Sequence, residues 1–307
     1  TVSEYGDSLS NERPLGPGTL TLGLGYRGIS ADSSEFGKHS ESSFHFLAAQ
    51  SVETPSFPLT LKAGIRANLN SAFENTFNPE FSVGYGNPKF RALYKISLGA
   101  NLPSFQQRFG RSASTDPNPG LGPEKGLNQS LGLDWFPFDF LTLNLTLFHN
   151  RLKGRISYVR PVDSGIGRYE NLGSTVYQGF DAGFVAKIGK PVELKVGYTF
   201  LDARDKDIGK FLTSRPRHSV LAELTFRAGD TFSLTLKADG ESKSYTDRMN
   251  TATLAPRTLF GLRAEKSFGN LVIFFDGTNI FDKEYYYVDG LLAPPRVFHL
   301  GTKYNFQ

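Results

Sequence analysis

The sequence predicts an all-β fold, a transmembrane up-and-down antiparallel β-barrel with about fourteen strands in this chain. Three observations lead to this prediction. Apolar and polar residues alternate along most of the chain, short and long connections alternate between these segments, and no segment shows a helical pattern. The composition is typical of strands and turns, because the 307 residues include 27 Phe, 13 Tyr and 32 Gly. No apolar stretch approaches the roughly 18 to 20 residues that a membrane-spanning helix needs.

The alternation begins near residue 18 and continues to the end of the chain. In the segment 58–70, for example, Leu61 and Ile65 belong to an apolar face, and Lys62 and Arg66 belong to the opposite, cationic face. In chain order, the predicted strands cover residues 18–30, 42–52, 58–70, 79–86, 89–101, 126–137, 139–160, 174–188, 191–203, 216–227, 230–243, 257–268, 270–281 and 296–306. Residues 1–17 are expected to be an N-terminal lead-in, and residues 18–307 are expected to form the barrel.

The predicted connections alternate between short turns and long polar loops. The short turns lie at 54–57, 86–88, 137–139, 189–190, 228–230 and around 269, and the long loops at 31–41, 71–78, 102–125, 161–173, 204–215, 244–256 and 282–295. In outer-membrane barrels, short turns face the periplasm and long loops face outside. Counting back from a periplasmic C-terminus places the start of the first strand, near residue 18, in the periplasm as well, as an even-stranded closed barrel requires.

The apolar face is expected to point to lipid. A barrel of about fourteen strands is too wide to fill with apolar side chains and leaves a lumen. The polar face therefore lines that lumen, and aromatic residues near the strand ends are expected to form girdles at the membrane surfaces.

Several classes of function find little support in the composition. The absence of Cys excludes disulfides, thiolate metal sites and a cysteine nucleophile. A formal net charge of +4 without a basic run argues against nucleic-acid binding. The five His have no metal-ligand spacing, and no Ser, His and Asp set is linked by spacing, so we expect neither a metal or cofactor nor an enzyme.

Two groups of residues are candidates for ligand binding. On the lumen wall, where Lys and Arg outnumber acidic residues, the candidates are Lys62, Arg66, Arg91 and Lys95. Such a wall favours anionic solutes, although cross-strand ion pairs or contacts with a plug are the alternative explanation. In the long loops, the candidates are Tyr245, Arg248, Tyr285 and Tyr286. Exposed tyrosines bind ligands at low entropy cost, but these could equally belong to the upper aromatic girdle.

Short motifs occur in order along the second part of the chain. They are Asn-Leu-Pro-Ser-Phe at 101–105, Asn-Pro-Gly-Leu-Gly-Pro-Glu at 118–124, Tyr-Glu-Asn-Leu-Gly at 169–173 with Gly179, Asn-Ile-Phe-Asp-Lys-Glu-Tyr-Tyr at 279–286, and Pro-Arg-Val-Phe at 295–298 with Gly301 and Tyr-Asn-Phe at 304–306. In sequence and order these motifs resemble those of TonB-dependent outer-membrane receptors, the energised importers of siderophores, cobalamin and similar scarce nutrients. The stretch before residue 101 agrees only in its strand pattern.

The resemblance implies a bacterial outer-membrane location, a surrounding lipid bilayer and the TonB system as a partner. It also implies an N-terminal plug inside a barrel of roughly 22 strands, yet neither the plug nor a TonB-binding box is visible in this sequence. The chain is thus either the C-terminal part of a receptor or a shortened relative without a plug. Two alternatives remain open, a plugless passive pore and a barrel that holds a partner protein in its lumen.

Overall fold

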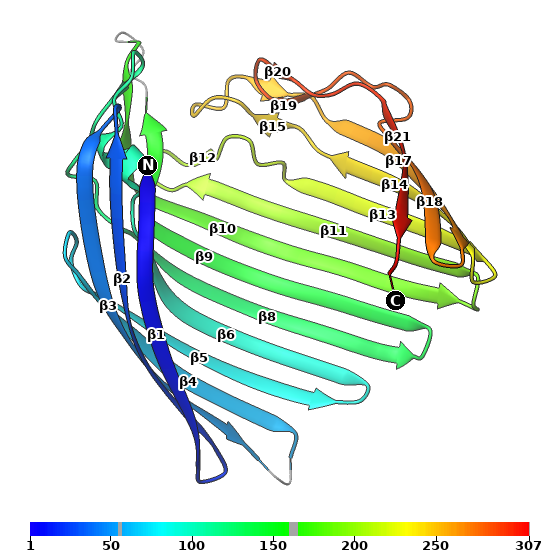
Figure 1. The fold of residues 1–307 in the computed structure, drawn as a ribbon, viewed down its shortest axis with the longest axis horizontal. Helices are drawn as coiled ribbons and strands as arrows, with labels where there is room; N and C mark the ends of the chain where they lie inside the picture. Colours follow the sequence, from blue (N-terminus) through cyan, green and yellow to red (C-terminus); the bar gives the residue numbers. More distant parts are fainter. Residues whose placement is uncertain (55–56, 160–164, 307) are drawn as a thin grey trace.

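The alternating segments fold into long strands, each paired with its neighbours along the chain in one curved antiparallel sheet (Figure 1). The computed structural model describes residues 1–54, 57–159 and 165–306. Setting aside the two-residue strands β7(Thr115–Asp116) and β12(Lys210–Phe211), the 17-stranded sheet contains fifteen long strands. These are β1(Val2–Leu15), β2(Gly18–Ser33), β3(Gly37–Glu53), β4(Leu59–Asn70), β5(Thr76–Asn87), β6(Phe90–Asn101), β8(Glu124–Phe138), β9(Leu141–Val159), β10(Gly167–Ile188), β11(Val192–Asp205), β13(His218–Ala228), β14(Phe232–Glu241), β17(Arg257–Phe268), β18(Leu271–Thr278) and β21(Val297–Tyr304).

The predicted up-and-down order and the alternation of connections are confirmed. At three of the predicted short turns, Gly189, Gly229 and Gly269 adopt φ values of 64°, 61° and 60°, a backbone conformation that favours glycine. The long loops carry two small hairpins, β15(Ser244–Tyr245) with β16(Thr253–Leu254) and β19(Tyr286–Val288) with β20(Leu291–Leu292). Some predicted segments extend beyond the described ranges, namely the turn 54–57, the strand 139–160 and the loop 161–173. Residue 307, the predicted end of the barrel, also lies outside them.

The sequence-based count is one strand too low, because β1 lies within the predicted lead-in. β1 pairs with β2 along its whole length, from Val2 opposite Ala31 to Leu15 opposite Gly18. Its apolar series is interrupted by Asp7 and Asn11, so the alternation is too weak to recognise. With fifteen long strands, the first strand begins at the long-loop side. Residue 18 lies at the short-turn side, as predicted, but it starts the second strand rather than the first.

The sheet has two open edges within the described residues. β1 pairs only with β2, and β21 pairs only with β18. Figure 1 shows these strands, blue and red, on opposite sides of an opening. The sheet is therefore a curved wall rather than a closed cylinder.

The convex face is apolar, and no other described element packs over it. Large side chains such as Phe46, Phe81 and Leu98 remain exposed there. At the short-turn end, the rings of Phe138 and Phe140 stack with centroids 5.2 Å apart, near the exposed Trp135. Exposed apolar strands with aromatic residues near their ends are the arrangement of a lipid-facing barrel wall.

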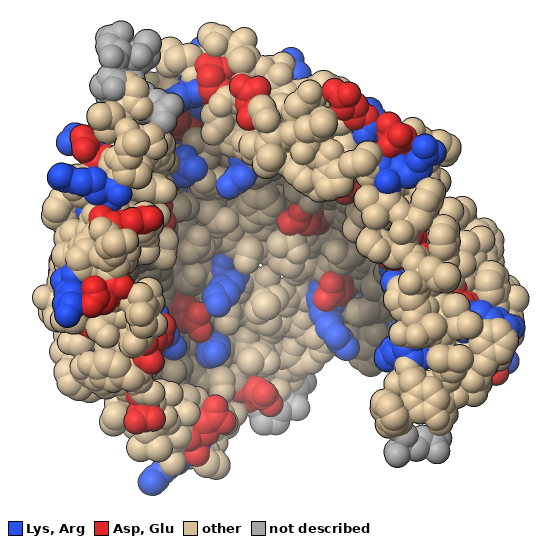
Figure 2. All heavy atoms as spheres, turned by 45° about the horizontal axis from the view of Figure 1, so that its top comes forward, with Lys and Arg blue, Asp and Glu red and all other residues tan. Residues whose placement is uncertain are grey.

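The concave face is polar, and charges of both signs are mixed on it (Figure 2). Many of them form cross-strand ion pairs. The guanidinium of Arg263, for example, contacts Asp276 on the neighbouring strand β18 at 3.0 Å, and it also contacts Glu265 on its own strand at 2.8 Å. The concave face thus supplies the wet lumen wall that the alternation predicts.

The one helix among the described residues, α1(Phe105–Phe109), has five residues and lies in the loop between β6 and β8. No helix in the described part of the chain is long and apolar enough to cross a membrane.

Candidate functional site

A cavity of about 900 Å³ lies on the concave face at the end of the sheet where the long loops begin. Its wall comes from β1 to β6, and residues 102–106 of the following loop also line it. The polar side chains in the lining are Glu4, Arg27, Glu41, Ser43, His45, Arg66, Asn68, Asn70, Thr76, Asn78, Asn101, Ser104 and Gln106. Amide groups that both donate and accept hydrogen bonds are therefore abundant around this cavity.

Helix α1 borders the cavity and is held by its own sequence. Ser104 is the N-cap, and its hydroxyl accepts a hydrogen bond from the Gln107 backbone N–H. The Gln107 side chain accepts a hydrogen bond in return from the Ser104 backbone N–H at 2.9 Å. This reciprocal capping box satisfies free backbone donors at the start of the helix, which allows so short a helix to form.

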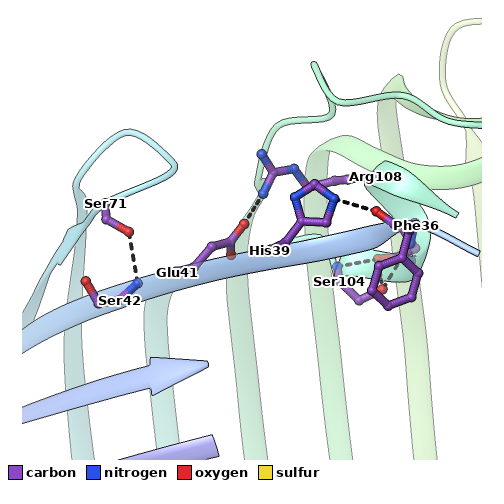
Figure 3. Close-up of polar contacts among 8 residues, drawn as sticks. Phe36, His39, Glu41, Ser42, Ser71, Ser104 and Arg108 are labelled. Carbon is purple, nitrogen blue, oxygen red and sulfur yellow. Dashed lines mark hydrogen bonds and ion pairs between the residues drawn. The ribbon is translucent and has the colours of Figure 1, made fainter. Parts of the chain in front are cut away.

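An ion pair fixes α1 to the outer end of β3. The Arg108 guanidinium pairs with the Glu41 carboxylate, and these side chains are only 10% and 20% exposed (Figure 3). The guanidinium also lies over the rings of Phe73 and Phe109, 4.5 Å and 4.6 Å from their centroids. A buried pair of this kind is costly to break from one side, because the remaining charge loses its partner.

Aromatic contacts extend this attachment. The His39 ring stacks on Phe109 with a centroid distance of 3.7 Å, and His39 Nε2 lies 2.7 Å from the carbonyl oxygen of Phe36 (Figure 3). On the same side, the Gln106 amide donates a hydrogen bond to Glu35 at 3.1 Å. Helix α1 is thus tied to the loop between β2 and β3 and forms a partial roof over the cavity.

The charge of Arg66 is not neutralised within the cavity. The Arg27 guanidinium pairs with Glu4 at 2.7 Å, and Glu41 is taken by Arg108. Arg66 forms no ion pair or side-chain hydrogen bond with the described residues, although it lines the cavity. Chemically, this arrangement suits a ligand that carries negative charge and many oxygen atoms.

The four predicted lumen-wall residues do not form one site. Lys62 and Lys95 lie on either side of Glu80, with nitrogen–oxygen distances of 3.6 Å and 3.0 Å. The Arg91 guanidinium lies 5.3 Å from the ring centroid of Phe136. Of the four, only Arg66 lines the cavity beside α1. Their role in ligand binding remains a prediction.

The predicted loop residues fall into separate clusters. Tyr245 stacks on Phe211 with ring centroids 5.8 Å apart. Arg248 contacts the buried carboxylate of Asp205 at 3.0 Å.

In the last long loop, Tyr285 faces the guanidinium of Arg257, which lies 5.1 Å from its ring centroid, and its hydroxyl is 3.5 Å from that of Tyr287. Burial and the Tyr287 hydroxyl raise the pKa of Tyr285 to about 12. Tyr286 is exposed beside Glu284, whose negative charge raises the pKa of Tyr286. Ligand binding by these loop residues likewise remains a prediction.

Sequence reasoning missed Arg108, Glu41 and the amide side chains of the cavity. The sequence contains one usable signal, the Ser104-x-x-Gln107 spacing of a capping box. The partner of Arg108 has no local signal, because Glu41 precedes it by 67 residues. Within the described residues, no group of three or more His, Asp or Glu side chains is placed to hold a metal ion.

Sequence comparisons show relatives along most of the chain. The family model described as TonB dependent receptor-like, beta-barrel, matches residues 3–280. The ferric enterobactin receptor of Pseudomonas aeruginosa is 26% identical over 191 residues, which are 57% of this chain and 23% of that protein. The vitamin B12 transporter BtuB of Photobacterium profundum is 23% identical over 253 residues, which are 80% of this chain and 40% of that protein.

Solved structures share the fold. A crystal structure of a mutant of the P. aeruginosa ferric enterobactin receptor PfeA superposes with a TM-score of 0.84 at 20% identity, covering 99% of this chain and 54% of that one. The siderophore receptor PirA from Acinetobacter baumannii superposes with a TM-score of 0.80 at 16% identity, with coverage of 99% and 55%. The chain thus spans about half the length of these solved chains and less than half of the two sequence relatives.

Proposed function

Because this chain belongs to the TonB-dependent receptor β-barrel family of the bacterial outer membrane, we propose that it forms the ligand-binding wall of a receptor that imports a siderophore, cobalamin or a similar scarce nutrient. The names of the two sequence relatives support the proposal, because one is a receptor for ferric enterobactin and the other a transporter of vitamin B12. The family consists of receptors and transporters, and we propose transport rather than catalysis for this chain as well.

The cavity beside α1 carries the proposal. Its volume of about 900 Å³ lies in the usual range of small-molecule sites. It opens on the lumen near the long loops, where a ligand from outside would arrive. Arg66 supplies a positive charge that no described residue pairs with, and the surrounding amides supply donors and acceptors for an oxygen-rich chelate.

We propose two partners for transport. A plug domain would pack against the polar concave face, and the TonB system would provide energy, as the family name indicates. The surrounding outer-membrane lipid contacts the apolar convex face.

The test is ligand binding by the protein in outer-membrane vesicles from a strain that lacks other receptors. We expect equilibrium dialysis to detect either a ferric catecholate chelate or cyanocobalamin, and Arg66→Gln to weaken binding of the charged chelate by about tenfold. Arg91→Gln is the matched comparison, because Arg91 is a lumen-wall candidate that lies outside the cavity. Unchanged affinity for this variant would favour the cavity as the site, and an equal loss would extend the site to the wider lumen wall.

The two alternatives give different results in the same vesicles. A passive pore would show solute flux that does not saturate and does not need TonB, and a sheath for a partner would show neither flux nor small-molecule binding. Equal affinities for Arg66→Gln and the wild type would reject the cavity as the ligand site.

A further inference from the structure

Three cations lie on the lipid-facing side of the sheet rather than in the lumen. In β8, Lys125 shares the face of Leu127 and the exposed Trp135, because side chains two residues apart point the same way. The register with β9 places Lys153 opposite Lys125 and Arg151 opposite Leu127. Lys125, Arg151 and Lys153 therefore cluster on the convex face at its long-loop end.

This cluster is poorly neutralised by the protein. Arg151 and Lys153 form no ion pair with the described residues, and Lys125 contacts only Glu74, at 2.7 Å, in a pair whose members are both more than half exposed. Lys125 directly opposite Lys153 is an unfavourable cross-strand pair. On the lumen side, by contrast, Lys62 and Lys95 share Glu80. An anion from outside the chain would remove the repulsion.

An apolar groove adjoins the cations. A cavity of about 500 Å³ on the convex face is lined by Phe77, Leu98 and Leu127 together with the three cations. Phe77 is 61% exposed. Leu98 pairs with Leu127, one step nearer the membrane centre than Ala100 and Lys125. The groove thus has an apolar floor towards the bilayer and a cationic rim towards the outside.

We propose that this groove is a binding site for a phosphate-bearing acyl lipid of the outer leaflet. An acyl chain would lie on Phe77, Leu98 and Leu127, and the phosphate would be held by Lys125, Arg151 and Lys153. A free phosphate ion would leave the apolar floor unused, whereas a lipid satisfies both halves of the groove. This inference rests on the outer-membrane position of the chain and is independent of the transported nutrient.

The experiment measures lipid that stays with the protein purified from outer membranes in mild detergent. Native mass spectrometry and a phosphate assay should find bound phospholipid or phosphorylated glycolipid on the wild type. The neutral variant Lys125→Gln/Arg151→Gln/Lys153→Gln should retain about tenfold less. The charge-preserving variant Lys125→Arg/Arg151→Lys/Lys153→Arg is the matched control and should retain the wild-type amount.

Thermal stability gives a second readout. In zwitterionic detergent the neutral variant should be at least as heat-stable as the wild type, because it lacks the Lys125–Lys153 repulsion. Added phosphatidylglycerol should raise the unfolding temperature of the wild type but not that of the neutral variant. Phosphatidylcholine should not stabilise the wild type more than the neutral variant. If the triple variant does not fold, Lys153→Gln alone provides the same comparison with a smaller shift.

A third arm separates lipid from free phosphate. Phe77→Ser should weaken retention of the lipid and leave binding of inorganic phosphate unchanged. Equal lipid retention by the neutral variant and the wild type would overturn the proposal, as would equal stabilisation of the wild type by phosphatidylcholine.

Discussion

Single side chains on the lumen wall differ in whether the protein already satisfies their charge. Lys62 and Lys95 share Glu80, and such partly exposed pairs contribute only about 0 to 1 kcal/mol each. They set the local charge balance rather than hold the sheet together. Arg66 faces the same lumen and has no ionic partner in the part of the chain that the structure describes, so its charge is available to a ligand.

Tyr285 provides a pH test of the loop structure. Its pKa of about 12 lies above the ordinary tyrosine value of about 10 because of burial and the Tyr287 hydroxyl, whereas Arg257 opposes the rise. We expect Tyr287→Phe to lower the pKa of Tyr285 and Arg257→Gln to raise it further. The ultraviolet absorbance of ionised tyrosine is measured against pH for the wild type and for Tyr285→Phe. The difference between the two curves gives the titration of Tyr285 alone.

The sign of the stability effect follows from proton binding. The folded loop holds the Tyr285 proton more tightly than the unfolded chain, so its contribution is complete below pH 10 and is lost as pH rises towards 12. A Tyr285 titration at the ordinary tyrosine value would mean that the loop does not bury the phenol.

At the scale of strands, the two faces of each element have opposite surroundings. Ile65 lies near the middle of β4, opposite Ala48 and Pro79, on the convex face, and is 44% exposed. Ile65→Arg should therefore reduce the free energy of unfolding by about 2 to 4 kcal/mol in a bilayer. Lys62→Arg, on the other face of the same strand, is the control and should change it little. Urea unfolding in phospholipid vesicles compares the two, and equal losses would reverse the assignment of the faces.

How much of each element could be predicted depends on whether its signal is local. Strands such as β4 and β11 were predicted because their alternation is regular, and the turns because Gly189 or Gly229 marks them. β1 was missed because Asp7 and Asn11 interrupt its apolar face. Arg66 was placed in the lumen by its strand alternation alone. The Arg108–Glu41 contact was beyond prediction, because it depends on how a long loop folds back over the sheet.

For the molecule as a whole, the two strands at the edges of the sheet run in the same direction. β1 and β21 both run from the long-loop side to the short-turn side, so a direct pair between them would be parallel. Antiparallel closure requires an odd number of further strands between them, and seven would bring the fifteen to the roughly 22 of large outer-membrane transporters. Of the two alternatives that the sequence leaves open, the shortened barrel that closes by itself with an even number of strands is therefore not what the described residues form.

Amide hydrogen exchange tests this edge directly. In the 307-residue chain in detergent, the β1 amides that point away from β2 should exchange rapidly, because among the described residues they have no strand partner. Amides of β2, which lies between β1 and β3, should be protected on both sides. Uniform protection along β1, measured residue by residue, would show that the edge is covered.

The sequential pairing of the strands also bears on how the chain folds. Each long ladder joins strands that follow one another along the chain. Pairing a new strand therefore closes only the one turn or loop before it, and the loss of loop entropy is modest. Hairpins can therefore add one after another without residues from the two ends ever meeting. Contacts such as Arg108 with Glu41 span 67 residues and need the intervening hairpins to be in place first. We infer that the roof of the cavity is assembled late, after the wall that it covers.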